Sequence, residues 1–188
     1  MVEQRKIPGG IELVGKRTVK SNEQPALADL QVVQTIRFTD GLNRIAVATT
    51  LVNRSGKTVS FGFRSNCVPA APGIEGGFAQ IAVGGKAVRL ERDNSRHIYT
   101  TGADRQFESV VRKLFEVVKP AERIDAAPVW FVSPGVRLKM TFAPREELAG
   151  AASWDSGNIS APTFEPCFRK VSLAPGKEIT YSSIFSLE

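Results

Sequence analysis

Residue types that could perform chemistry are sparse in this sequence. The single histidine, His97, excludes a zinc site built on several histidines, and a Ser-His-Asp arrangement would have to use it. There is no phosphate-binding loop, no Gly-x-Gly-x-x-Gly, no His-Glu-x-x-His and no Gly-x-Ser-x-Gly. Asp93-Asn94 and Asp155 to Asn158 carry oxygens suited to calcium, but these residues are equally ordinary in turns. We therefore expect neither a cofactor nor a metal.

The charged residues argue against nucleic acid as a partner. Lys and Arg number 25 against 19 Asp and Glu, a net charge of +6, but the basic residues are scattered and no aromatic-basic motif accompanies them. Several fall where the exposed face of an antiparallel sheet carries long solvated side chains, namely Arg37, Arg44, Arg64, Arg89, Lys139 and Arg169. The modest positive field favours acidic ligands such as uronic acid polymers.

Length and composition predict one ordinary globular domain over residues 1–188. The chain is 42% hydrophobic and 23% charged, which excludes a disordered or fibrous protein. No stretch approaches the roughly 20 apolar residues of a membrane span, and MVEQRKIPGG lacks the apolar centre of a secretion signal. We expect a soluble domain that does not enter a membrane, with its compartment left open. Cys67 and Cys167 are expected as free thiols, with a disulfide between them as the alternative.

Short runs of alternating apolar and polar residues, separated by turn residues, predict antiparallel strands that position any site. Asp40-Gly41, Asn53 to Gly56 and Gly84-Gly85 are typical turns, and Ala174-Pro175-Gly176-Lys177 suits a type II turn. The predicted strands cover residues 30–38, 43–52, 57–64, 78–83, 86–91, 128–132, 136–142, 167–173 and 178–187. The first three are expected to form a meander.

One segment departs from this rhythm. Phe107, Val110, Val111, Leu114, Phe115 and Val118 follow helical spacing. Asp104 is placed to cap the start of such a helix, and Pro120 to end it. With at least eight strands and at most one short helix, about residues 104–118, the sequence predicts a mainly β fold, an antiparallel β-sandwich.

Two segments resemble galactose-mutarotase-like sandwiches. In the first, Leu51-Val52-Asn53 leads through Ser55-Gly56-Lys57 into an aromatic strand and a glycine- and proline-rich loop. In the second, Phe164-Glu165-Pro166 precedes Leu173-Ala174-Pro175-Gly176-Lys177 and a closing strand. The resemblance covers about half of the chain and implies a carbohydrate-handling sandwich of the supersandwich type. The chain is shorter than a complete mutarotase, so part of the usual sugar cleft is expected to be missing.

The resemblance also implies residues for a sugar epimerase. Such enzymes open the sugar ring with a glutamate as base and a histidine as acid. Glu165 is the position that matches the base, and His97 is the histidine available as acid, although the residues around His97 do not match the histidine segments of the family.

Sugar binding without catalysis needs an aromatic face and a few planar polar groups. Trp154 lies in a polar loop segment, which favours it as the aromatic face, whereas Trp130 lies in an apolar run and is expected in the core. Arg64 and Asn66, where the third strand leaves for its loop, are the predicted polar contacts.

The leading hypothesis is a carbohydrate-binding or accessory domain without a complete catalytic set. The alternatives are a mutarotase-like epimerase that uses Glu165 and His97, and a structural sandwich that binds other proteins.

Overall fold

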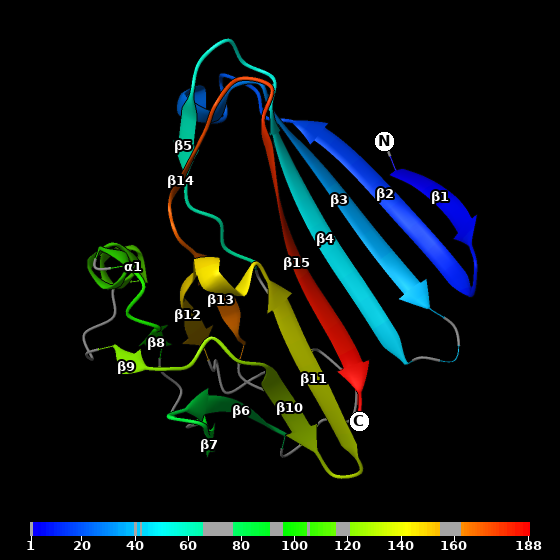
Figure 1. Ribbon diagram of the computed structural model, residues 1–188, viewed down its shortest axis with the longest axis vertical. Helices are drawn as coiled ribbons and strands as arrows, with labels where there is room; N and C mark the ends of the chain where they lie inside the picture. The colour runs from blue at the N-terminus through cyan, green and yellow to red at the C-terminus, as the bar shows by residue number, and fades with distance from the viewer. Residues whose placement is uncertain are drawn as a thin grey trace. The chain divides into compact units, whose positions relative to one another are not determined.

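The computed structural model describes residues 2–39, 41, 43–65, 77–90, 96–104, 106–115, 121–154 and 163–188 (Figure 1). The described chain is mainly β with one α-helix, which confirms the predicted fold class. It divides into two compact units, each assembled from segments that are distant in the sequence. Unit 1 comprises residues 1–62, 142–144 and 170–186, and unit 2 comprises residues 63–141, 145–169 and 187–188. The single domain over residues 1–188 stays a prediction.

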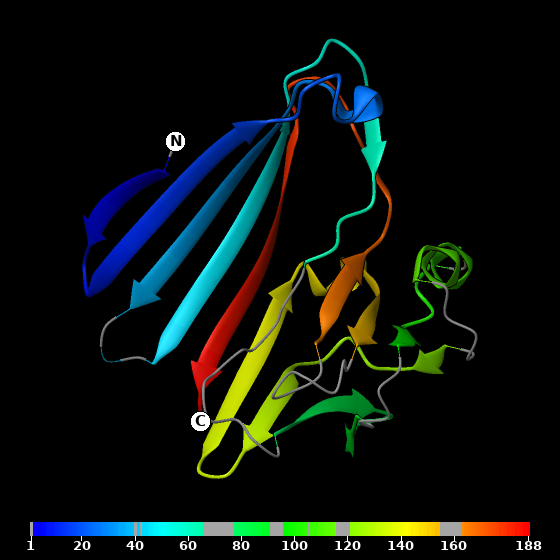
Figure 2. The ribbon, with the colours of Figure 1, turned by 180° about the vertical axis from the view of Figure 1, so that it is seen from behind.

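Unit 1 is built on five antiparallel strands that lie side by side in the order β1-β2-β3-β4-β15 (Figure 2). Their bounds are Val2–Ile7, Gly10–Thr18, Leu30–Thr39, Arg44–Asn53 and Glu178–Leu187. A short 3-10 helix, η1 (Pro25–Leu27), precedes β3, and a two-stranded ribbon pairs β5 (Val59–Phe61) with β14 (Val171–Leu173).

Alternation and turn chemistry explain the strands of unit 1 that the sequence predicts. In the β3 and β4 register Leu30 faces Asn53 and Val32 faces Leu51, and Leu30, Asn53 and Leu51 are all buried. Before β15, Gly176 has φ +72° and the Lys177 N–H donates to the Ala174 carbonyl at 3.1 Å, as the predicted type II turn requires.

The predicted meander is wrong. Strand β4 pairs with β3 and with β15, whereas β5 turns away from β4 and pairs with β14. Asn53 explains the turn: its amide donates to the Lys57 and Leu173 carbonyls, both at 2.8 Å, and its Oδ1 accepts from the Ser55 N–H and hydroxyl. The Leu-x-Asn motif is thus a structural clamp between β4 and the ribbon.

Unit 2 contains two sheets. The first has the strand order β11-β10-β6-β7, with bounds Val136–Ala143, Val129–Ser133, Phe78–Val83 and Lys86–Arg89. The second, which we call the small sheet, has the order β13-β12-β8-β9, with bounds Glu165–Phe168, Leu148–Trp154, Arg96–Thr100 and Glu122–Arg123. A 3-10 helix, η2 (Arg145–Glu147), leads into β12. The glycines between β6 and β7, Gly84 and Gly85, both have positive φ, as the predicted tight hairpin requires.

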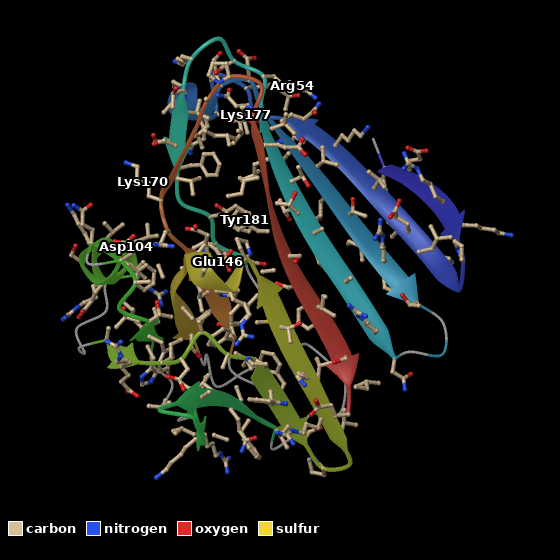
Figure 3. The ribbon with its side chains drawn as sticks, viewed as in Figure 1. Arg54, Asp104, Glu146, Lys170, Lys177 and Tyr181 are labelled. Carbon is tan, nitrogen blue, oxygen red and sulfur yellow. The ribbon has the colours of Figure 1, made fainter. Side chains whose placement is uncertain are left out.

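The single α-helix of the described chain, α1 (Phe107–Phe115), packs on β8 and β12. Asp104 caps it as predicted, because its Oδ1 accepts from the N–H groups of Gln106 and Phe107 (Figure 3). The helix begins at Phe107, a few residues after the start of the predicted span of about residues 104–118. Residues 116–118 of that span, and Pro120, lie outside the described residues. The apolar stripe of the described helix is only partly covered. Phe107 and Val111 are buried against the small sheet, whereas Val110 and Leu114 are exposed. The described helix is too short to cross a membrane.

Candidate functional site

The pairing register of the small sheet sorts its side chains into two faces. Directly paired residues point to the same side of an antiparallel sheet, and successive residues alternate between sides. Ala152 on β12 pairs with Glu165 on β13 and with Ile98 on β8. Gly150 pairs with Cys167, and Trp154 with Arg96. These residues share the side on which α1 packs, since Ile98 and Cys167 form one buried cluster with Phe107 and Val111, and the Phe107 ring lies against Gly150. We call it the helix-side face.

Arg64 joins this face from outside the regular strands. It forms an isolated antiparallel bridge with Cys167, the Ser65 N–H donates to the Pro166 carbonyl at 3.1 Å, and the Phe168 N–H donates to the Phe63 carbonyl at 2.8 Å. The chain from Phe63 to Ser65 therefore runs beside β13. The bridge gives Arg64 the same orientation as Cys167, which brings it onto the helix-side face.

Glu165 is nine-tenths buried on the helix-side face, with 9% of its surface exposed. Its Oε2 lies 3.2 Å from Nη1 of Arg64, an ion-pair distance, yet no hydrogen bond of suitable geometry reaches this oxygen from the described residues. A buried carboxylate oxygen without a hydrogen bond costs about 1–3 kcal/mol. Such a group marks a point where a donor from a ligand would be stabilising.

Trp154 ends β12 on the same face and is 43% exposed. Its backbone N–H and carbonyl are both bound by Thr163: the N–H donates to the Thr163 hydroxyl at 3.0 Å, and the carbonyl accepts from the Thr163 N–H at 2.9 Å. The Arg96 guanidinium carbon lies 5.6 Å from the centre of the Trp154 rings, within the range of a cation–π contact. An exposed indole is thus held in place at the edge of the helix-side face.

Spacing along the sheet brings these groups within reach of one small ligand. Trp154 and Glu165 are diagonal neighbours on adjacent strands, a relation that separates side chains by about 7–8 Å. Between them on β12 lies Ala152, whose small side chain leaves the carboxylate and the indole unobstructed by a bulky neighbour on that strand. An aromatic face, a carboxylate and a guanidinium therefore share one side of one sheet.

Gly150 explains how α1 comes so close to this sheet. A Cβ at position 150 would overlap the Tyr99 carbonyl oxygen and the Phe107 ring. Only glycine allows this approach, so the helix-side face depends on that residue.

Cys167 is a buried free thiol on the same face. Burial raises its pKa to about 12, with nearby Arg64 opposing the rise. The thiol therefore stays protonated at neutral pH and is unsuited to nucleophilic chemistry. Cys67, the other half of the disulfide alternative, lies outside the described residues.

The predicted site residues are only partly brought together. Glu165, Arg64 and Trp154 share the helix-side face, but His97 pairs with Ser153 and therefore points to the opposite side of the small sheet. There it is buried and its ring stacks with Tyr99 at a centroid distance of 6.3 Å. The sheet thus separates His97 from Glu165. Asn66 and the two candidate calcium segments lie outside the described residues.

Two residues differ from their sequence-based roles. Trp130 was expected in the core, but it is half-buried and its indole N–H donates to a carboxylate oxygen of Glu188 at 3.2 Å. Arg96 carried no functional signal in the sequence, because its contact with Trp154 arises from pairing between β8 and β12, segments about 50 residues apart.

Comparisons with known proteins bear on the fold. No family model matches the sequence, and no curated protein matches it either. Among solved structures, the Slr1438 protein from Synechocystis aligns with all of this chain and 65% of its own, with a TM-score of 0.68 and 10% identity. A putative aldose 1-epimerase from Klebsiella pneumoniae aligns with 99% of this chain and 53% of its own, with a TM-score of 0.59 and 15% identity.

A third solved structure is part of a larger enzyme. The GH36 α-galactosidase AgaA from Geobacillus stearothermophilus, in complex with stachyose, aligns with all of this chain and 25% of its own, with a TM-score of 0.51 and 10% identity. The chain spans about half to two thirds of the first two relatives. At these identities the likeness concerns the fold, and it confirms the resemblance at that level: the chain has the galactose-mutarotase-like β-sandwich fold.

Proposed function

We propose that this chain is a carbohydrate-binding or accessory domain and that its ligand lies on the helix-side face of the small sheet. In this proposal Trp154 stacks on the apolar side of a pyranose ring, Arg64 donates to ring or hydroxyl oxygens, and the Glu165 carboxylate accepts from a hydroxyl. Asn66, predicted from the sequence to contact the ligand, belongs to the same proposal.

The observation that carries the proposal is the Glu165 carboxylate. It is nine-tenths buried, its Oε2 receives no hydrogen bond from the described residues, and it shares a face with an exposed indole. Sugar hydroxyls are donors that would complete its hydrogen bonding, and sugars are also the ligands for which an exposed, fixed indole is suited. The fold relatives named as an aldose 1-epimerase and as an α-galactosidase with stachyose support the same ligand class.

The epimerase alternative finds less support. A base and an acid that act on the same sugar must reach it together, but His97 and Glu165 point to opposite sides of the small sheet. A polarimetric assay of anomerisation on simple aldoses separates the two functions. An accessory domain leaves the rate at its uncatalysed value, whereas acceleration that is lost in Glu165→Gln would overturn the proposal.

The direct test is binding to an array of neutral and acidic glycans, followed by titration of the bound sugars. Stachyose is the first probe, because a fold relative is complexed with it. We expect Trp154→Ala to weaken binding at least about fivefold, since aromatic stacking contributes about 1 kcal/mol. Phe38→Ala is the matched control, because Phe38 is an aromatic of similar exposure in unit 1, at 41% against 43%.

Glu165→Gln and Arg64→Ala are expected to weaken binding as well, and Asn66→Ala tests the contact that the sequence predicts. Binding that is equally strong in Trp154→Ala and in Phe38→Ala would remove the helix-side face as the site. No binding to any glycan of the array would leave the structural, protein-binding class of sandwich as the better description.

A further inference from the structure

The outer face of the other sheet in unit 2 carries a second, separate group of side chains. Ala79, Ile81, Val129, Phe131 and Met140 are buried on the inner face of β6, β10 and β11. Alternation therefore places their neighbours on the outer side. We call this set the basic-aromatic face, and it consists of Phe78, Gln80, Arg89, Trp130, Arg137 and Lys139.

The register aligns these residues in two rows across four strands. Arg89 pairs with Gln80, Gln80 with Trp130, and Trp130 with Lys139. In the next row Phe78 pairs with Val132, and Val132 with Arg137. The strands that carry the rows, β7, β6, β10 and β11, follow one another in the sheet (Figure 1).

Two arginines of this face are stacked on aromatic rings. The Arg89 guanidinium carbon lies 4.2 Å from the centre of the Phe78 ring, and that of Arg137 lies 5.1 Å from the centre of the Trp130 rings. Both arginine side chains are largely accessible, with Arg137 at 46%. Stacking fixes the orientation of the planar guanidinium before a ligand binds and leaves the N–H groups at its edge able to donate. This edge matches the two oxygens of a carboxylate.

The stacked pairs are close enough to serve one ligand. Phe78 and Trp130 lie on adjacent strands as diagonal neighbours, about 7–8 Å apart, so the two guanidinium groups stand over neighbouring positions of the sheet. Gln80, which pairs with both Arg89 and Trp130, adds an amide that can bind hydroxyls.

Charge on this face is positive overall. Arg89, Arg137 and Lys139 are opposed by Glu188, which lies 3.1 Å from Lys139 and 3.7 Å from Arg137. Across the described chain no carboxylate lies within ion-pair distance of Arg89. Three cations against one carboxylate complement a ligand that carries several negative charges.

We infer that the basic-aromatic face binds an acidic polysaccharide, with Arg89 and Arg137 each receiving a uronate carboxylate of the same chain. A row of side chains across four strands suits an extended polymer better than a single sugar. Single-stranded nucleic acid fits less well, because its bases require uncovered aromatic faces for stacking, and here each ring carries an arginine. This binding surface shares no side chain with the helix-side face.

Affinity electrophoresis and titration with polygalacturonate test the inference, with fully methyl-esterified polygalacturonate as the uncharged counterpart and poly(U) as the nucleic acid. We expect the full chain to bind polygalacturonate, more weakly as salt rises, and not to bind the methyl ester. Arg89→Ala/Arg137→Ala should weaken this binding at least about tenfold, a change of about 1.4 kcal/mol. Circular dichroism and thermal unfolding confirm that each variant folds.

Matched variants separate specific recognition from general attraction. Arg44→Ala/Arg54→Ala removes the same charge from exposed positions of unit 1 and should leave the affinity unchanged. Arg89→Lys/Arg137→Lys keeps the charge but loses the planar fork, and should weaken binding nearly as much as the alanine pair. Trp154→Ala should not affect this binding, so failure here and failure of the proposed sugar site are distinguishable.

Several results would overturn the inference. Among the variants, these are a loss of affinity in Arg44→Ala/Arg54→Ala equal to that in Arg89→Ala/Arg137→Ala, and wild-type affinity in Arg89→Lys/Arg137→Lys. Among the ligands, they are binding of the methyl ester as tight as that of polygalacturonate, tighter binding of poly(U), and no binding of polygalacturonate at low salt.

Discussion

Glu12 in unit 1 and Glu165 in unit 2 are carboxylates of almost the same burial, at 7% and 9% exposed, but they differ in their hydrogen bonding. Oε2 of Glu12 accepts a hydrogen bond from Arg37 at 2.6 Å, and Oε1 lies 3.7 Å from Arg5. Both oxygens thus face a cation from an adjacent strand. Oε2 of Glu165 lies 3.2 Å from one arginine without a hydrogen bond from the described residues.

The difference separates a structural polar group from a candidate functional one. Strand pairing alone gives Glu12 its two arginine partners, because Arg5 on β1 and Arg37 on β3 lie directly opposite Glu12 on β2. Glu165 has instead Ala152 opposite it on β12, with Ile98 beyond Ala152 on β8, and neither can donate a hydrogen bond from its side chain. Burial by itself therefore does not mark a site, whereas burial with incomplete hydrogen bonding does.

The largest expected effect comes from removing a polar group whose hydrogen bonds are complete. Asn53→Ala in unit 1 deletes two donated bonds at 2.8 Å and two accepted bonds, and it leaves the Leu173 carbonyl without this donor. We expect the free energy of unfolding to fall by about 3 kcal/mol, measured by urea denaturation. Sugar binding at temperatures where the variant is folded should be unchanged. A loss of stability below about 1 kcal/mol would show that the clamp is not needed.

The paired substitutions Glu12→Gln and Glu165→Gln test the comparison itself. Glu12→Gln replaces a charge-assisted bond to a largely exposed arginine, and should lower the free energy of unfolding by about 1 kcal/mol without affecting sugar affinity. Glu165→Gln should change stability by less than about 0.5 kcal/mol, because Arg64 is 41% exposed and can be hydrated instead. It should, however, weaken sugar binding.

Urea denaturation measures the stability of the two variants, and titration with a bound sugar measures their affinity. If Glu165→Gln destabilises the protein more than Glu12→Gln and leaves sugar affinity intact, Glu165 is a structural residue and the comparison fails.

A smaller effect is expected from the protonation of Cys167. Its raised pKa means that the folded protein keeps this proton at pH values where the unfolded chain loses it, so stability falls as pH rises above about 8.5. Between pH 7 and pH 9 the wild type should lose about 0.8 kcal/mol more than Cys167→Ala. Denaturation curves of both proteins at the two pH values measure the difference. An identical pH dependence in the two proteins would contradict the raised pKa.

The fold could be predicted from the sequence where strands have one buried face. Strand β15 matches its predicted range of residues 178–187, β3 is one residue longer than predicted at its end, and β4 is shifted by one residue. Strand β12 was missed because it is buried on both sides by small residues, so LAGAASW shows no alternation. Strand β1 was missed because most of its residues are exposed, and β2 because one of its buried residues is Glu12, which breaks the apolar alternation.

The site could be predicted only in its residue types. Trp154, Arg64 and Glu165 were candidates from the sequence, but the face that each occupies depends on the register between strands that are separate in the sequence. The paired residues are 13 apart for Ala152 and Glu165, 58 apart for Arg96 and Trp154, and 103 apart for Arg64 and Cys167. A shift of one residue in the pairing of β8 with β12 would have placed His97 rather than Ile98 opposite Ala152, on the same face as Glu165. The predicted strand over residues 167–173 is divided in the structure into β13 and β14, which belong to different units, and local alternation cannot reveal that division.

The most direct test of sugar binding at the helix-side face uses the two tryptophans of the chain. A nitrogen-15 correlation spectrum should show one indole N–H signal for Trp154 and one for Trp130, assigned with Trp154→Phe. When stachyose or another neutral sugar that binds on the array is titrated in, we predict that the Trp154 signal shifts in a saturable way and the Trp130 signal does not. A shift confined to Trp130, or no shift of either signal at saturation, would contradict the site.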